Sequence, residues 1–192
     1  MASFRYFVGV LLVVSLPPAV AWWIVVHPFV GFWRALGARV AMATLAVLIV
    51  AGAVALVFVR DTLLGRDLGT SWPRASVAVA LIAAAGVMAF RRRRHLTARI
   101  LMGMPELEGD ARNLLTEGPY AAIRHPRYVE VALGVFAYAF FANYVGAYVV
   151  AVATVPALHV VVLLEERELA QRFGAAYETY RSRVPRYVPR WR

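Results

Sequence analysis

The stretch LTEGPYAAIRHPRY, from Leu115 to Tyr128, leads directly into an apolar segment of the chain. Gly118-Pro119 signals a turn, because Gly permits a positive φ and Pro fixes the next backbone step. Pro126 suits the first position of a helix and holds His125, just before it, in an extended conformation. The stretch therefore predicts a turn followed by a helix whose free N–H groups, beside His125, favour an anionic ligand group.

The rest of the chain is too apolar for an ordinary soluble protein. Hydrophobic residues make up 61% of the 192 residues and charged residues 17%, whereas a soluble domain has about 25% charged residues. We therefore expect an all-α integral membrane protein. It would form a single polytopic domain over residues 1–192, with N-terminal helices in residues 1–94 and a catalytic half in residues 95–192.

The apolar runs predict about five membrane-spanning helices. Pro17-Pro18 either kinks the first of these helices or splits it into a helical hairpin, because each Pro removes a backbone donor. A cleaved signal peptide is another interpretation of this first run, but the run is long for one and ends in the bulky pair Trp22-Trp23. A tight hairpin is expected over residues 143–146. The expected spans are Phe4–Val26, Ala38–Val59, Ala75–Phe90, Tyr128–Ala142 and Ala147–Leu164.

Composition also narrows the possible chemistry. The chain has no Cys, which excludes disulfides and thiolate metal sites, and we expect no metal centre. The net charge is +10, and every basic residue is Arg. A basic excess can indicate nucleic-acid binding, but these arginines cluster at the ends of the apolar segments, where they anchor and orient helices, so no nucleic-acid partner is expected. The Lys-free, Ala- and Arg-rich composition is typical of a GC-rich bacterial genome.

The arginines also predict the orientation in the membrane. The block Arg91–Arg94 and the arginines of the C-terminal tail lie on the same side of a five-span protein, and the positive-inside rule places that side in the cytoplasm. The N-terminus and the loop Arg60–Arg74 then lie outside. The polar segments His95–Arg127 and Glu165–Arg192 would therefore share the cytoplasmic face of a bacterial inner membrane. A water-soluble cofactor would bind there, at a site built from the third-to-fourth loop and the C-terminal helix.

Two further pieces of sequence follow the last apolar run. The first is the pair Glu165-Glu166, whose charges are unfavourable at the C-terminal end of a helix, so the helix is expected to continue to Phe173. A solvated helix face with local Glu–Arg pairs is the alternative. The second is FGAAYETYRSRVPRYVP, from Phe173 to Pro189, whose aromatic residues recur on one helical face. It predicts a C-terminal amphipathic helix that ends at Pro185.

In this order, the three pieces resemble the C-terminal half of the isoprenylcysteine carboxyl methyltransferase family, whose members are integral membrane enzymes that use S-adenosylmethionine. The resemblance implies that the C-terminal segment closes over the cofactor, and that Glu165 or Glu166 meets the ammonium group of its methionine part. Arg124 matches an Arg of the family, or else pairs with phospholipid phosphate. The residues implied to line the cofactor pocket are Asn113, Leu114, Leu115, Tyr120, His125, Pro126, Arg127 and Tyr128.

The sequence departs from this family at two places. An Arg that precedes the Glu pair in the family is replaced by the apolar residues Val161 and Val162, and a Gly of the family is replaced by Glu130. Both departures weaken the case for an isoprenylcysteine carboxylate acceptor, and a phospholipid amine or the hydroxyl of a long-chain phenolic or pyrone lipid stay as alternatives. Because ionisable residues in spans are functional candidates, we expect Glu130 and His159, with Glu165, to contact the substrate or act as a general base.

Two other classes of protein compete with this interpretation. Membrane sterol reductases share a segment like RHPRY but use NADPH; the Glu pair followed by the FGAAYETY sequence favours the methyltransferase. A small non-enzymatic membrane protein would bind no nucleotide at all. The methyltransferase interpretation predicts S-adenosylmethionine as cofactor, and as partners membrane lipids and a lipophilic or lipidated acceptor that enters from the bilayer.

Overall fold

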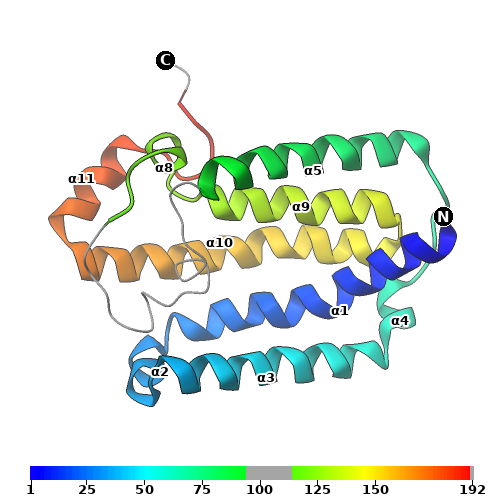
Figure 1. Cartoon of the computed structure of the whole chain (residues 1–192), viewed down its shortest axis with the longest axis horizontal. Helices are drawn as coiled ribbons and strands as arrows, with labels where there is room; N and C mark the ends of the chain where they lie inside the picture. The colour runs from blue at the N-terminus through cyan, green and yellow to red at the C-terminus, as the bar shows by residue number, and fades with distance from the viewer. Residues whose placement is uncertain (94–113, 191–192) are drawn as a thin grey trace.

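The computed structural model describes residues 1–93 and 114–190, which form a bundle of helices (Figure 1). Over this part of the chain no strand is present, apart from one isolated bridge between Asp67 and Tyr144. The predicted all-α class is therefore confirmed. The helices are α1 (Ala2–Val26), α2 (Val30–Leu36), α3 (Ala38–Val57), α4 (Arg60–Leu64), α5 (Trp72–Arg93), α8 (Pro119–Ala122), α9 (Pro126–Ala142), α10 (Val145–Phe173) and α11 (Ala175–Arg183).

The long helices lie side by side along the long axis of the molecule (Figure 1). Among the described residues, α1, α3, α5 and α10 are long and apolar enough to cross a membrane. The chain is thus an integral membrane protein with four candidate spans. Helix α9, with 17 residues, packs against α5, α10 and α1, and its role as a fifth span stays a prediction.

Helix α1 runs unbroken from Ala2 to Val26, with Pro17 and Pro18 inside it. The alternative of a helical hairpin split at these prolines is therefore wrong. The facing helix α3 accommodates Pro18 through Gly52, since a Cβ atom on Gly52 would lie 3.0 Å from the Pro18 ring. A small residue opposite a proline lets two helices approach closely in a membrane.

The chain reverses direction between successive long helices, so the bundle has two distinct ends (Figure 1). The first, here called the α4 end, holds the N-terminus, α4 and the turn between α9 and α10. The second, here called the α11 end, holds α2, α8 and α11. Among the described arginines, Arg5, Arg60, Arg66 and Arg74 belong to the α4 end, whereas the α11 end has Arg34, Arg39, Arg91, Arg92, Arg93, Arg124, Arg127, Arg167, Arg172, Arg181, Arg183, Arg186 and Arg190.

At the α4 end the predicted tight hairpin between α9 and α10 is confirmed. Asn143 adopts the left-handed conformation, with a φ of 57°. Its side chain donates a hydrogen bond to the Gly69 carbonyl (2.7 Å) and accepts one each from Arg74 and the Tyr148 hydroxyl (3.0 Å each). These contacts fix the turn to the loop before α5.

Arg5 closes the same end from the side of α1. It is almost fully buried, and its guanidinium pairs with Asp67 and donates hydrogen bonds to the Ala142 carbonyl (3.1 Å) and the Thr70 hydroxyl (3.4 Å). The contact between α10 and α4 is also close, because a Cβ atom on Gly146 would lie 1.7 Å from the Leu63 carbonyl oxygen. The α4 end is thus tightly packed, with its polar groups paired inside the protein.

Several helices begin or end at other residues than the sequence predicted. Helix α10 continues to Phe173, as expected from the Glu pair. It stops there because Gly174 takes a φ of 53°, and α11 follows as a separate helix instead of beginning at Phe173. Helix α5 is longer than expected and includes Trp72 at its start and the first three arginines of the basic block at its end.

Candidate active site

A buried carboxylate, that of Glu166 in α10, lies at the centre of the α11 end, with 5% of the residue exposed. Arg124 donates to it from Nε (3.1 Å) and Nη2 (2.9 Å), and Arg186 donates from Nε (3.0 Å) and Nη2 (2.6 Å). His125 Nε2 lies 3.0 Å from the same carboxylate. A buried charge is tolerated when it is paired and hydrogen-bonded, and Glu166 meets both conditions.

Arg124 connects this carboxylate to the end of α11. Its Nη1 donates hydrogen bonds to the carbonyls of Arg181 (3.0 Å) and Val184 (2.5 Å). The last carbonyls of a helix lack partners within the helix, so Arg124 supplies the missing donor. Since Nε, Nη1 and Nη2 all bond protein groups, the structure does not support the alternative in which Arg124 pairs with phospholipid phosphate.

The segment after α11, residues 184–190, is here called the C-terminal strap. It runs beside the residues that precede α9: the Arg124 amide donates to the Pro185 carbonyl (2.8 Å) and the His125 amide to the Arg186 carbonyl (3.2 Å). In addition, the Tyr180 hydroxyl of α11 donates to the Tyr120 carbonyl in α8 (2.8 Å). The segment before α9, the end of α10 and the C-terminal part of the chain therefore meet at one place, as the sequence predicted.

Glu165, next to Glu166, has different surroundings. Its Oε2 atom is buried and has no hydrogen-bond partner in the described residues 1–93 and 114–190. His125 Nδ1 lies 3.7 Å from it, which is too long for a hydrogen bond. Tyr120 lies within reach of its charge, since the pKa of Tyr120 is raised first by burial and then by Glu165, while Arg92 and Arg127 act in the opposite direction. The site thus contains one carboxylate that is fully paired and one with a free acceptor atom.

The two other predicted acid–base residues point to different neighbours. Glu130 accepts two hydrogen bonds from Arg92, at 2.9 Å from Nε and 2.8 Å from Nη2, which tie α9 to α5. His159 Nδ1 lies 2.7 Å from the hydroxyl of Tyr187 in the C-terminal strap. The structure therefore separates Glu130 from His159, and their roles in catalysis stay predictions.

The remaining predicted residues fall into three groups. Pro126 is buried at the first position of α9, and the Tyr128 ring lies 5.8 Å from the His125 ring. Arg127 instead turns to α1, where its guanidinium lies 4.9 Å from the centre of the Trp23 ring. Leu114 and Leu115 are half-buried in the irregular segment that leads to α8, and Asn113 lies outside the described residues.

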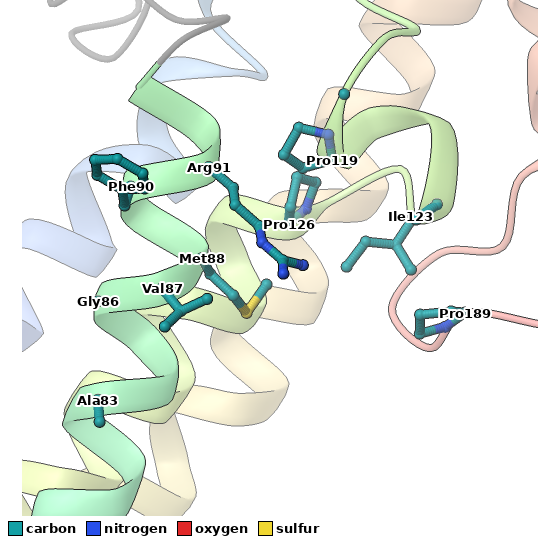
Figure 2. A pocket seen from close by; sticks show the side chains of 12 residues that line it. Ala83, Gly86, Val87, Met88, Phe90, Arg91, Pro119, Ile123, Pro126 and Pro189 are labelled. Atoms are coloured by element: carbon teal, nitrogen blue, oxygen red, sulfur yellow. The ribbon is translucent and has the colours of Figure 1, made fainter.

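Within the described part of the chain, two cavities flank the site. The larger, of about 870 Å³, lies between α5, α8, the start of α9 and Pro189 of the C-terminal strap. Figure 2 shows Arg91 and Met88 extending from α5 toward Ile123 across this cavity. The smaller, of about 540 Å³, lies between α9 and α10 and includes Tyr128, His159 and Tyr187 in its lining. The site is thus bordered by two apolar spaces, on either side of α9.

Sequence reasoning missed two residues of this site, Arg186 and Tyr187. Their signal was weak, because they follow α11 in a short Val-Pro-Arg-Tyr segment that was expected only to end the helix. The structure brings Arg186 onto Glu166 and Tyr187 onto His159. The hydrogen bond to Glu166 raises the pKa of the Arg186 guanidinium, which keeps it charged.

A model of the phospholipid methyltransferase family matches residues 73–176, more than half of the chain. The chain belongs to the phospholipid methyltransferase family. No curated protein and no solved structure matches it. The matched region contains α5, α8, α9 and α10, and so includes His125, Glu165 and Glu166. It ends inside α11 and leaves out Arg186 and Tyr187.

Membership of the phospholipid methyltransferase family makes the chain a membrane methyltransferase of lipids in the broad sense. This agrees with the general part of the resemblance seen in the sequence, since isoprenylcysteine carboxyl methyltransferases belong to the same broad group. The narrower assignment to that family is not confirmed by the match.

Proposed function

We propose that this membrane methyltransferase uses S-adenosylmethionine and transfers its methyl group to a lipophilic acceptor held in the bilayer. The observation that carries this proposal is the division between the two adjacent glutamates. Glu166 is saturated by Arg124, His125 and Arg186, whereas the buried Oε2 of Glu165 has no hydrogen-bond partner among the described residues. A buried carboxylate oxygen left without a partner costs free energy, which a cationic ligand group would offset.

The chemistry of the surrounding groups fits the two ends of the cofactor. Its ammonium group matches Glu165, and its carboxylate matches the N-terminal turn of α9, where the helix dipole and free N–H groups favour an anion. The pocket residues proposed from the resemblance complete the set: Asn113, Leu114, Leu115, Tyr120, His125, Pro126, Arg127 and Tyr128. When bound, the cofactor supplies a methyl group on a positively charged sulfur.

The paired groups of the site have a positioning role in this proposal. Arg124 holds α10 and the end of α11 together, and His125 bonds Glu166 through its side chain and Arg186 through its amide. Methyl transfer depends mainly on the alignment of donor and acceptor, which contributes about 7–11 kcal/mol to lowering a barrier. A rigid frame around Glu166 is suited to provide that alignment.

The acceptor is drawn from lipids that reach the site sideways from the membrane. The candidates are a lipid amine, a lipid hydroxyl and an isoprenylcysteine-like carboxylate, and the family match supports the amine. Val161 and Val162, which replace the Arg of the isoprenylcysteine enzymes, are fully buried in the bundle. No cation therefore takes the place of that Arg at these positions, which weakens the case for the carboxylate.

The proposal also includes the orientation of the protein. The α11 end holds most of the described arginines, and by the positive-inside rule it faces the cytoplasm, where the cofactor is available. The lipid acceptor then approaches along the helices, while the cofactor approaches from the water phase.

Isothermal titration tests the proposal. Folded protein in nanodiscs is titrated with S-adenosylhomocysteine and, separately, with NADPH. We expect binding of the first and not of the second. The variant Glu165→Gln should bind S-adenosylhomocysteine tenfold or more weakly, because losing a charged hydrogen bond costs about 1.5–3 kcal/mol. Glu178→Gln, on the exposed face of α11, is the matched control and should bind normally. Absence of binding to folded wild-type protein would contradict the proposal.

A further inference from the structure

The smaller cavity, between α9 and α10, combines mostly apolar walls with a few polar side chains. Its walls are apolar, formed by side chains such as Ala132, Leu133, Phe136 and Val155. Of the residues that line it, only Tyr128, His159 and Tyr187 carry polar side-chain groups. Val155 is 48% exposed on the surface of a candidate span. An acyl or isoprenoid chain can therefore enter this groove from the bilayer without passing through water.

The polar groups of the groove are connected to the candidate cofactor site. Tyr187 lies between them, since its hydroxyl is 2.7 Å from His159 Nδ1 and its ring is 6.3 Å from the ring of His125. Its neighbour Arg186 is held by Glu166 through two hydrogen bonds. The position of Tyr187 is therefore fixed by the frame around Glu166, and the groove leads from the membrane to that frame.

We propose that Tyr187 and His159 form a proton-accepting pair at the polar end of a lateral groove for the acceptor lipid, and that the methylated group is an amine or a hydroxyl, not a carboxylate. This inference rests on the function proposed above. It narrows that function in two ways, since it assigns a base and excludes one class of acceptor.

The chemistry of the acceptor explains why a base is needed. A carboxylate attacks a methyl group without losing a proton, whereas an ammonium group or a hydroxyl must give up one proton. The Tyr187 oxygen accepts this proton while the Tyr187 O–H proton passes to Nδ1 of neutral His159, which becomes an imidazolium. The lone pair of the acceptor forms the new bond to the methyl carbon of the sulfonium donor, and the electrons of the broken carbon–sulfur bond stay on sulfur.

The surroundings of the pair agree with this relay. Burial raises the pKa of Tyr187, so its phenol stays protonated at neutral pH and passes a proton on instead of holding a charge. Among the described residues no Arg lines the groove. Arg124 and Arg186 lie near the pair but are bonded to Glu166, so a carboxylate in the groove would meet no Arg that is available to pair with it. The other titratable groups around the pair come from α9, from the segment before it, from α10 and from the strap: Tyr128, Arg124, His125, Glu165, Glu166 and Arg186.

The first experiment measures the rate against pH for Tyr187→Phe and His159→Gln, with Tyr138→Phe as the control because Tyr138 is exposed on α9. The substrates are phosphatidylethanolamine vesicles, a long-chain phenol and a farnesylcysteine carboxylate. In the wild type the rate should rise with pH, because a base takes up the proton of the acceptor only in its deprotonated form. Both variants should lose this rise and fall about 10²–10⁴-fold in kcat at neutral pH. Tyr138→Phe should match the wild type.

A second measurement does not depend on turnover. A fatty amine with a diazirine in its chain is crosslinked to the protein in nanodiscs, and the labelled residues are mapped by mass spectrometry. We expect labels on the α9 and α10 residues of the groove, unchanged in Tyr187→Phe and lost in Ala132→Trp, which fills the groove. S-adenosylhomocysteine should bind all variants equally.

The outcomes separate the two proposals. If the wild type does not bind S-adenosylhomocysteine, the proposed function itself fails. If it binds, the inference is overturned by any of three results: a wild-type pH profile in Tyr187→Phe and His159→Gln, methylation of the carboxylate alone, or labels outside the groove. A lost pH dependence together with groove labelling supports it.

Discussion

The two ends of the bundle use buried charges in different ways. At the α4 end every nitrogen of Arg5 has a partner, and both polar atoms of the Asn143 side chain are hydrogen-bonded. At the α11 end the carboxylate of Glu166 is also fully hydrogen-bonded. Other buried polar atoms at this end, however, have no hydrogen-bond partner among the described residues. The buried side-chain atoms without a hydrogen-bond partner among the described residues all lie at this end: His27 Nε2, Trp33 Nε1, Arg92 Nη1, Glu165 Oε2, Arg172 Nε and Nη1, and Tyr177 Oη.

We interpret this difference as the one between a structural closure and the proposed binding site. An unsatisfied buried polar group costs about 1–3 kcal/mol, so a fold that only had to be stable would not collect such groups at one end. The α4 end shows that this chain can pair its buried polar groups when they serve packing alone. The free atoms of the α11 end are what a site prepared for a polar ligand would contain.

The largest expected effect concerns the frame of the α11 end. Glu166→Gln removes the charge that pairs with Arg124 and Arg186, and breaking a buried ion pair destabilises a protein by about 3–5 kcal/mol. We expect a clear fall in the thermal unfolding midpoint and, with it, loss of S-adenosylhomocysteine binding. An unchanged midpoint would show that Glu166 is not the structural centre of this end.

An intermediate effect is expected at the opposite end. Arg5→Met removes the ion pair with Asp67 and the hydrogen bond to the Ala142 carbonyl, while Asp67 keeps its hydrogen bond from the Gly69 amide. Since Asp67 is partly exposed and can bond water, the loss of stability should be smaller, about 1–3 kcal/mol. The affinity for S-adenosylhomocysteine should not change. A weakened affinity in this variant, measured by titration at a temperature where it is folded, would break the distinction between the two ends.

The smallest effect should come from the contact of α11 with α8. Tyr180→Phe removes a single hydrogen bond to the Tyr120 carbonyl, worth about 0.5–1.5 kcal/mol. Burial raises the pKa of Tyr180 to about 12, so the phenol is a neutral donor and the effect should be the same at pH 6 and pH 9. Thermal unfolding at both values, with Tyr138→Phe as the control, checks this. A pH-dependent difference would contradict it.

The sequence predicted the elements of the fold better than the partners within the site. Apolar runs and Pro126 located the long helices, and the tight turn at Asn143 followed from the short polar break between two of them. Glu165 and Glu166, however, could not be told apart. Neighbouring residues on a helix point about 100° apart, so their surroundings depend on how α10 is rotated in the bundle.

The contacts of the C-terminal strap were also beyond the reach of the sequence. Arg186 meets Glu166, and Tyr187 meets His159, across turns whose path no local pattern specifies. Glu130 was expected to contact the substrate or act as a base because it is ionisable and lies in an apolar segment, and that role stays a prediction. Its hydrogen bonds with Arg92 of α5 were not foreseen. Such pairings arise from packing between helices distant in sequence, and only the folded chain brings them together.

Hydrogen–deuterium exchange with and without S-adenosylhomocysteine tests the central claim most directly, because it examines both ends of the molecule in one experiment. Ligand binding at the α11 end should slow exchange in residues 114–128 and 174–190. It should leave the α4 end unchanged, in residues 65–74 and 142–148. Protection at the α4 end, or no protection at either end despite measured binding, would contradict the assignment of the α11 end as the cofactor site.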